Sequence, residues 1–172
     1  ALAGYPVPLA AVVAGPCLGG AFEVVLACHF VLGTPTASFG CPEIKLGVFP
    51  PVLAAIGPQQ LGGATTERLL LTGANLDVGT AERIGWLTKT IAGEDLLDEA
   101  LAWYRETLQP LSAFSLRQAV AVSRGAGGMR ARLGTALEEA ERRYLEGLVP
   151  SHDGNEGIGA FLERRKPNWT NA

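Results

Sequence analysis

Short apolar runs separated by turn residues dominate the first part of the chain. The segment Leu9–Ala14 is apolar throughout and ends at Gly15-Pro16, which is typical of a fully buried strand. Phe30–Leu32 predicts a second strand and Ala37–Phe39 a further extended piece, and a helix opens between the first two strands at Gly19-Gly20. Strands interleaved with short helices indicate the α/β class.

The middle of the chain continues this alternation. We expect a loop over Gly47–Pro51, because two prolines remove backbone donors and disfavour a helix immediately before them. The pattern then predicts a helix ending over Thr66–Leu71, a turn over Thr72–Asn75 and a short helix over Val78–Ile84. Trp86–Ile91 alternates like a half-buried strand.

Helical periodicity replaces the short apolar runs from Gly93 onward. Four segments have the pattern of amphipathic helices with charge on one face: Glu94–Leu108, Ser115–Val122, Met129–Leu148 and Glu156–Arg165. We place a boundary at Pro110, between an α/β core over residues 1–110 and a helical region over residues 111–172.

Composition narrows the classes of function. The chain has 172 residues, of which 48% are hydrophobic and 18% charged, so one domain with a sizeable core is expected. The net charge of −3 disfavours nucleic acid as a main partner. The apolar N-terminal run is interrupted by prolines and has no basic leading region, which favours buried strands over a membrane span. Three cysteines without a close pair indicate reduced thiols in a cytoplasmic protein.

Charge is scarce at the start of the chain. Glu23, Glu43 and Lys45 are the only charged residues among the first 66 positions. Burying an unpaired carboxylate is costly, so Glu23 in its apolar setting predicts a raised pKa and chemical use. Two acids in such a stretch suggest a carboxylate pair for acid/base chemistry. The alternative for Glu43 is a partly exposed acid paired with Lys45.

Three further features have competing interpretations. Gly19-Gly20 at a helix start suits either an ordinary tight turn or an oxyanion site that holds a thioester or similar carbonyl. His29 is expected to be structurally satisfied and to make no metal site. His152-Asp153 is expected to form a solvated turn, and no metal site is predicted anywhere.

Several segments together resemble the enoyl-CoA hydratase/isomerase (crotonase) family. The resemblance covers nearly the whole chain and is most specific around the two glutamates. The matching segments are Ala11–Glu23, Phe39–Gly47, Leu70–Gly73, Ala81–Leu87 and Glu156–Lys166. It implies a spiral of ββα units over residues 1–110, the C-terminal portion of the crotonase core, followed by a helical trimerisation region over residues 111–172.

The resemblance also implies roles for individual residues. Gly20 matches the family glycine whose N–H forms half of the oxyanion hole, and Glu23 and Glu43 match the two glutamates that hold and activate water. Phe161 and Arg164 match C-terminal positions that approach the CoA of a neighbouring subunit in the family's trimers. The implied activity is that of a hydro-lyase, the reversible addition of water to an α,β-unsaturated acyl-CoA.

The same resemblance sets expectations for partners. The substrate is an acyl-CoA thioester, and no cofactor is expected because coenzyme A is part of the substrate. We expect a cytoplasmic homotrimer or hexamer with no nucleic-acid or membrane partner. The alternatives are an enoyl-CoA isomerase of the same family and a non-catalytic relative that binds acyl-CoA or RNA.

Some positions depart from the family pattern. The family's first segment, which supplies the other oxyanion N–H, is missing, so we expect a longer protein or another chain to provide it. Ala21 replaces a usual third glycine, and Pro51 has no N–H where the family's turn helps to bind water. Gly47–Pro51, Cys28-His29 and Leu111–Arg117 are more similar to the cyclohexa-1,5-dienecarbonyl-CoA hydratases within the family.

Overall fold

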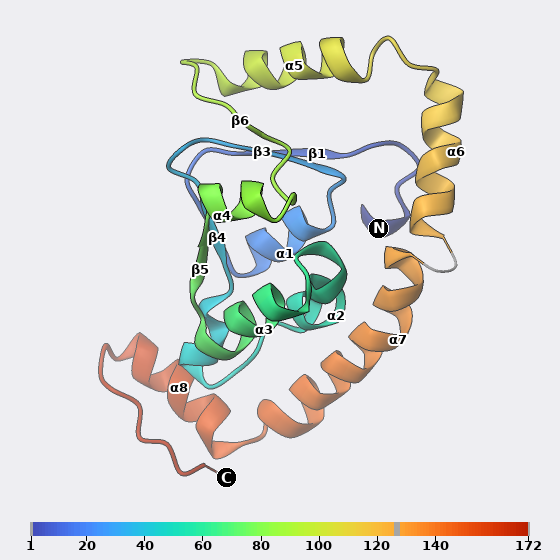
Figure 1. The fold of residues 1–172 in the computed structure, drawn as a ribbon. Coiled ribbons are helices and arrows are strands. Elements are labelled where there is room, and N and C mark those ends of the chain that lie inside the picture. The colour runs from blue at the N-terminus through green and yellow to red at the C-terminus, as the bar shows by residue number, and fades with distance from the viewer. Residues whose placement is uncertain (1, 126–127, 172) are drawn as a thin grey trace.

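Two small sheets form the centre of the first half of the molecule (Figure 1). The structure is a computed structural model that describes residues 2–125 and 128–171. One sheet has the order β1-β3-β6 and is parallel, with strands Ala10–Val13, Phe30–Gly33 and Lys89–Thr90. The other has the order β2-β4-β5, with strands Pro16–Leu18, Ser38–Gly40 and Asn75–Asp77. The pair β2–β4 is parallel and the pair β4–β5 is antiparallel.

The strands confirm the α/β prediction and correct it in detail. The predicted strands at Leu9–Ala14 and Phe30–Leu32 are β1 and β3, which pair directly with Ala10 opposite Phe30. Gly15-Pro16 ends β1, but a second strand, β2, begins directly at Pro16. Proline is tolerated there because the first residue of a strand can lack a backbone N–H. The strand predicted over Trp86–Ile91 shortens to Lys89–Thr90.

Short helices surround these sheets. Their bounds are Leu2–Gly4 for η1, Gly20–Leu26 for α1, Pro42–Leu46 for η2, Pro51–Gln60 for α2, Gly63–Thr72 for α3 and Val78–Arg83 for α4. Helix α2 was not predicted, and the predicted loop therefore ends at Pro50. Pro51 is the first helical residue, where the absent N–H removes no helical hydrogen bond.

Helix α2 contains two residues of low helix propensity, which is why the sequence pattern did not predict it. Pro58 lies inside it, and Gly57 is buried where it meets α3. A Cβ at Gly57 would lie 2.7 Å from Thr66 Cγ2, so glycine is required for the two helices to approach this closely. Tertiary packing thus outweighs the weak helix propensity of both residues.

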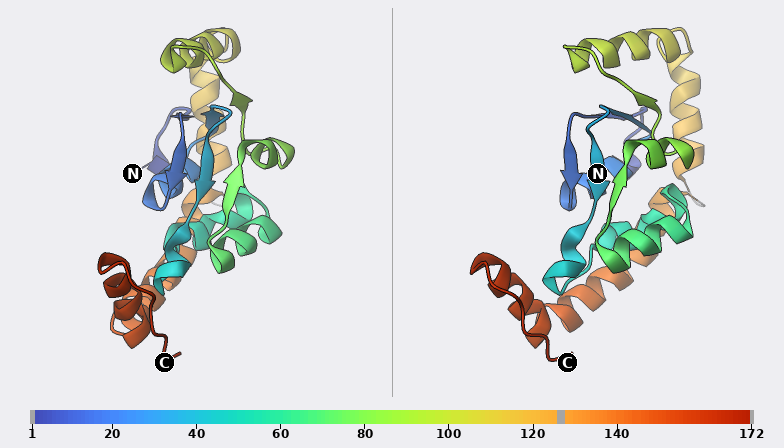
Figure 2. Two further views of the ribbon diagram at one scale, coloured as in Figure 1. Left: turned by 90° about the vertical axis from the view of Figure 1, so that its left-hand side faces the viewer. Right: turned by 60° about the vertical axis from the view of Figure 1, so that its left-hand side comes forward.

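The second half of the chain is helical, as predicted. Its elements are α5 (Leu96–Thr107), α6 (Ala113–Arg124), α7 (Met129–Arg142), the π-helical η3 (Arg143–Leu148) and α8 (His152–Leu162). Figures 1 and 2 show them as an arc around the outside of the α/β core, with α7 running alongside α2. None of the helices among residues 2–125 and 128–171 is long and apolar enough to cross a membrane.

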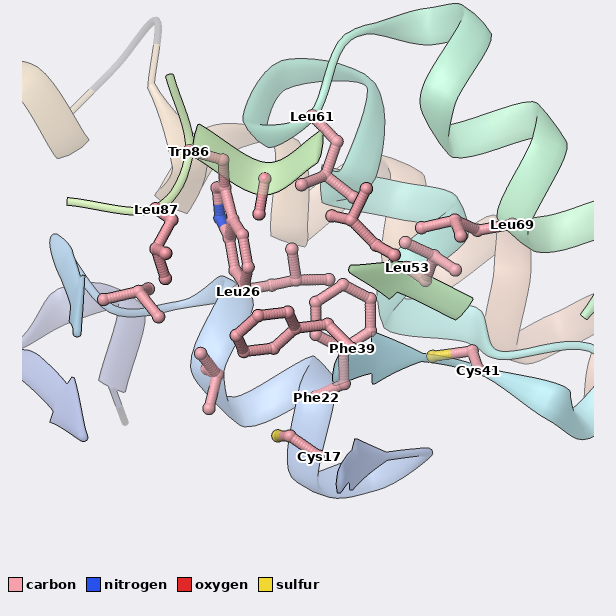
Figure 3. Packing of buried hydrophobic residues seen from close by; sticks show 14 of the residues in the cluster. Cys17, Phe22, Leu26, Phe39, Cys41, Leu53, Leu61, Leu69, Trp86 and Leu87 are labelled. Carbon is pink, nitrogen blue, oxygen red and sulfur yellow. The ribbon is translucent and has the colours of Figure 1, made fainter. Parts of the chain in front are cut away.

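An aromatic cluster fixes α1 against the second sheet. The ring of Trp86 meets those of Phe22 and Phe39 edge-on, with centroid separations of 5.5 and 4.9 Å (Figure 3). Phe22 and Phe39 are fully buried, and Leu26 lies one turn beyond Phe22 in the same core. Because Phe22 is anchored in this way, the position of its neighbour Glu23 is set by the core.

Candidate functional site

The Gly19-Gly20 turn is held against strand β4. The N–H of Gly19 donates to the carbonyl of Gly40 at 2.8 Å, and Gly19 has φ 60° and ψ −134°, a conformation that essentially only glycine adopts. A Cβ at Gly19 would lie 3.0 Å from Glu43 Oε1, whereas one at Gly20 would meet nothing within 4 Å. Gly20 therefore starts α1 with open space beside it, and its N–H belongs to the first turn, which has no intrahelical acceptors.

Glu23 reaches from α1 to the start of α2. Its Oε1 accepts hydrogen bonds from the backbone N–H groups of Val52 at 2.8 Å and Leu53 at 3.0 Å. Pro50, the N-cap residue of α2, supplies no side-chain acceptor. Glu23 thus satisfies two N–H groups of the first turn of α2 and places its negative charge at the positive end of that helix.

Glu43 lies in η2, directly after Cys41 and Pro42. Its Oε1 faces the Gly19 turn, and its Oε2 is buried with no hydrogen-bond partner among the described residues. Among the residues that the structure describes, Lys45 forms no ion pair with Glu43, so the alternative of a solvated Glu43–Lys45 pair is not supported. A buried carboxylate oxygen without a partner is unusual and indicates a position for a donor from a ligand or water.

Burial raises the pKa of both carboxyl groups, and the charge of Glu43 contributes to the rise at Glu23. Burial raises the pKa of Glu23, the N–H groups of Leu53 and Val52 oppose that rise, and the charge of Glu43 adds to it. Burial also raises the pKa of Glu43, opposed by its own backbone N–H and by the thiol of Cys41. Burial raises the pKa of the Cys41 thiol in turn, so it stays protonated and able to donate. Both carboxyl groups therefore bind a proton more readily than ordinary glutamates do.

The two C-terminal residues predicted for CoA binding lie on and just beyond α8. Helix α8 packs against η2, the segment that carries Glu43. Phe161 is 65% exposed and lines a cavity of about 380 Å³ together with Pro42 and Lys45. Arg164 follows the helix, is exposed, and has a positive φ of 55°. The structure thus brings Gly20, Glu23 and Glu43 together and places Phe161 beside η2.

Both histidines differ from the prediction. His29 was expected to be structurally satisfied, but only one ring nitrogen is: Nδ1 accepts the N–H of Leu9 at 3.0 Å, whereas Nε2 is buried with no partner among the described residues. Burial lowers the His29 pKa to about 4. His152 and Asp153, expected in a solvated turn, instead form the first turn of α8. Asp153 also binds the backbone N–H groups of Thr170 and Asn171, a long-range contact that no local pattern indicates. Residues 2–125 and 128–171 contain no cluster of three or more potential metal-ligating side chains.

Comparison with known proteins gives a consistent result. Residues 1–172 match the family model for enoyl-CoA hydratase/isomerase. A cyclohexa-1,5-dienecarbonyl-CoA hydratase from Thauera aromatica is 42% identical over 166 residues, which cover 96% of this chain and 63% of that protein. A probable enoyl-CoA hydratase from Mycobacterium bovis is 37% identical over 177 residues, covering 98% of this chain and 65% of the other.

Solved structures agree with the sequence matches. A crystal structure of an enoyl-CoA hydratase/isomerase from Pseudoalteromonas atlantica has a TM-score of 0.84 at 26% identity, covering 98% of this chain and 67% of that one. A carnitinyl-CoA hydratase structure from Mycobacterium avium has a TM-score of 0.82 at 29% identity, with 92% and 60% covered. The chain spans less than two thirds of the length of the curated relatives described above.

Proposed function

Because this chain belongs to the enoyl-CoA hydratase/isomerase family and has the crotonase fold, we propose that the protein adds water reversibly to the double bond of an α,β-unsaturated acyl-CoA. The proposal is made for the whole protein, since the chain spans only part of the length of its relatives. Coenzyme A enters as part of the substrate, and the proposed reaction uses no further cofactor.

The observation that carries this proposal is the convergence of Gly20, Glu23 and Glu43. These residues lie on two different elements, α1 and η2, that the Gly19–Gly40 hydrogen bond and the aromatic core hold together. The group combines a backbone N–H of the first turn of α1 with two partly buried carboxylates whose pKa values are both raised by burial. Hydration of an enoyl thioester requires an oxyanion donor, a base and an acid.

The thioester carbonyl would accept a hydrogen bond from the Gly20 N–H. As the water oxygen bonds to the β-carbon, negative charge develops on that carbonyl oxygen, and a donor aimed at it lowers the barrier. The ionised carboxylate of the pair takes a proton from the water, and the protonated one delivers its proton to the α-carbon. We assign the proton to the pair and to neither residue alone, because the charge of Glu43 contributes to the raised pKa of Glu23.

Water would be held without help from residue 51. Pro51 has no N–H, and the next two N–H groups, of Val52 and Leu53, already bind Glu23 Oε1. The second oxygen of Glu23 and the unpartnered Oε2 of Glu43 are therefore the atoms proposed to accept from the water.

A cyclic dienoyl-CoA is the substrate we favour. The supporting observations are the 42% identity to a cyclohexa-1,5-dienecarbonyl-CoA hydratase and the similarity of Gly47–Pro51 to that subfamily. We further propose a cytoplasmic trimer or hexamer, in which Phe161 and Arg164 approach the CoA of a neighbouring subunit. The exposure of both residues is compatible with such a contact.

The test uses the full-length protein with a panel of linear enoyl-CoA and cyclic dienoyl-CoA substrates. We expect Glu23→Gln and Glu43→Gln each to lower kcat for hydration by about 10²–10⁴-fold, the usual contribution of a general acid or base. Glu67→Gln, at an exposed glutamate of α3, is the matched control and should leave kcat unchanged. Near-normal hydration in both site variants would contradict the proposal.

Two further outcomes identify the alternatives. Loss of double-bond migration in Glu43→Gln with retention in Glu23→Gln would indicate an isomerase, since that reaction needs one well-placed base. A rise in thermal stability with RNA and none with acyl-CoA would indicate a binding protein.

A further inference from the structure

A buried cation lies at the end of α1 remote from Gly20, and the proposed reaction does not use it. Arg124, the last residue of α6, is 8% exposed. Its Nη1 donates to the carbonyl of Ala27, the C-cap residue of α1, at 2.5 Å and approaches the sulfur of Met129 at 3.2 Å. Because Ala27 and Met129 both belong to the main core, the guanidinium is held in a fixed position.

The charge of this guanidinium has no counter-ion in the described part of the chain. No carboxylate among residues 2–125 and 128–171 lies within 4.0 Å of Arg124. The two contacts occupy the Nη1 hydrogens, and the N–H groups on Nε and Nη2 have no acceptor among the same residues. Arginine stays protonated in proteins. Nε and Nη2 are not among the fully buried side-chain atoms without a partner, so their N–H groups face space that solvent or a ligand can reach.

Two titratable side chains, His29 and the thiol of Cys28, lie close enough to Arg124 to interact with its charge. Burial and the positive charge of Arg124 lower the His29 pKa to about 4, so His29 is neutral near pH 7. His29 Nδ1 accepts the Leu9 N–H, so its Nε2 carries the proton, and that atom is buried without a partner in the described chain. His29 does not line the cavity beside Arg124, so the preference for a negatively charged hydrogen-bond acceptor comes from the guanidinium itself.

Arg124 opens onto a small cavity between the N-terminal segment and α6. The cavity measures about 170 Å³ and is lined by Gly4, Tyr5, Val120 and a second cation, Arg130. Figure 1 shows η1 next to α6, near the end of that helix where Arg124 lies. The volume is below the 300–1,000 Å³ of sites that enclose drug-sized ligands, so a nucleotide or an acyl-CoA cannot be enclosed here.

We propose that this cavity binds a small oxyanion, a phosphate or a carboxylate group, through the free N–H groups of Arg124, with Arg130 adding charge at its rim. The planar guanidinium can donate two parallel hydrogen bonds to either group. The contact with Ala27 alone would make Arg124 a structural cap of α1, and that simpler role predicts no response to added anions.

Thermal unfolding of the full-length protein distinguishes the two roles. The protein is placed in a buffer without oxyanions, and inorganic phosphate or acetate is added while chloride holds the ionic strength constant. We expect the Tm of the wild type to rise by about 2–4 °C once the bound anion is several-fold above its Kd. A rise with phosphate only, or with acetate only, identifies the bound group.

The variants make the test specific. Arg124→Gln keeps a donor for the Ala27 carbonyl but removes the charge, and its Tm should not respond to either anion. Arg130→Gln should respond at higher concentration, and Arg105→Gln, at an exposed arginine of α5, should respond like the wild type. An unresponsive wild type, or an equal rise in Arg124→Gln, would overturn the proposal. If Arg124→Gln does not fold, calorimetric titration of the wild type and Arg130→Gln with phosphate and acetate decides in the same way.

Discussion

The carboxylates of Glu23 and Glu43 each combine a proposed chemical role with a structural one. Glu23 accepts hydrogen bonds from two N–H groups in the first turn of α2, and Oε1 of Glu43 packs against Gly19. Substitutions at this site therefore need controls that separate lost chemistry from altered packing. Two measurements provide such controls: the pH dependence of stability, and a comparison of alanine substitutions at Gly19 and Gly62.

Stability should depend on pH through Glu43. Burial raises its pKa above the ordinary value of 4.5, so the folded protein binds this proton more tightly than the unfolded chain does. The resulting stabilisation is complete below pH 4.5 and is lost as the pH rises through the folded-state pKa. Glu43→Gln removes this dependence, so its stability relative to the wild type should increase as the pH rises above 4.5. Urea unfolding at several pH values measures the difference, and a constant difference would contradict burial of the charge.

Gly19→Ala should impair catalysis beyond its effect on folding. The conformation of Gly19 costs a residue with a Cβ about 1–3 kcal/mol, and the new Cβ would also displace Glu43. Gly62 has φ 80° and ψ 152°, but a Cβ there meets nothing within 4 Å, so Gly62→Ala is the matched control. We expect both variants to lose similar stability in urea unfolding.

Only Gly19→Ala should lose hydration activity. The loss should reach roughly 10²-fold, the scale of a 1 Å misplacement at a reacting centre. Equal kcat values in the two alanine variants would show that the position of Glu43 is not critical.

At the residue scale, the sequence predicted the carboxylate pair but not what holds it. The scarcity of charge before residue 66 was enough to single out Glu23 and Glu43. The hydrogen bonds from Val52 and Leu53 to Glu23 are long-range, and Pro51 hid the helix start from which they come. Arg124 gave no local signal either, because its burial depends on how α1, α6 and α7 meet.

The C-terminal segment after α8 acts as a strap over η2. Asp153 and Glu156 bind the backbone N–H groups of Thr170, Asn171 and Asn168, and Glu156 also pairs with Arg165 at 2.5 Å. Trp169 lies over Gly47, the left-handed residue that ends η2, where a Cβ would be 3.0 Å from its ring. The strap therefore supports the element that carries Glu43.

Glu156→Gln should release this strap without unfolding the core. Arg165 and the Asn168 N–H lower the pKa of Glu156 to about 2, so its stabilising contacts are complete above the ordinary value of 4.5 and lost as the pH falls toward 2. Hydrogen exchange in the variant near pH 7 should accelerate for residues 163–171 and stay unchanged in β1 and β3. Glu163→Gln, at an exposed acid that contacts only the side chain of Arg165, is the control. Equal protection of the segment in both variants would contradict the strap.

Elements were predicted best where their pattern is local. The amphipathic helices α5 to α8 and the apolar strands β1 and β3 were predicted within a few residues. Strands β2 and β5 were missed because they form by pairing with β4, which is distant from both in the sequence. Helix α2 was missed because Gly57 and Pro58 lower the helix propensity of this segment. Packing against α3 stabilises the helix in spite of them.

Across the whole molecule, α7 links the helical arc to the α/β core. Met129 at its start is 2% exposed and belongs to the same cluster as Phe22 and Trp86. Leu133 and Leu137 pack against that cluster from the following turns. The boundary at Pro110 stays a prediction, because contacts of this kind join the two sides of it.

Met129→Ala should therefore destabilise the core and the arc together. Truncation of a buried methionine typically costs about 2–5 kcal/mol. We expect the urea midpoints from Trp86 fluorescence, measured with Trp103 and Trp169 replaced by phenylalanine, and from far-UV circular dichroism to fall by the same amount. Two separated transitions would show that the helical region unfolds by itself, and Leu145→Ala, at a 64% exposed leucine of η3, should leave both midpoints nearly unchanged.

The family resemblance predicted the fold class, but no pattern in the chain predicted the path of the arc. Helix periodicity identifies which face of each helix is apolar and does not say which partner covers it. The close approach of α7 to α2 depends on a helix that the sequence concealed.

The bond between Glu23 and the first turn of α2 links proton affinity to helix stability. A proton on Glu23 weakens its acceptance from Val52 and Leu53, and a firmer first turn of α2 makes that proton harder to bind. Since α7 packs along α2, the packing of these two helices and the protonation of Glu23 are thermodynamically linked through the stability of α2. A substitution anywhere along the α2–α7 contact that tightens the helix should therefore make Glu23 a stronger acid, without touching the reaction centre at all.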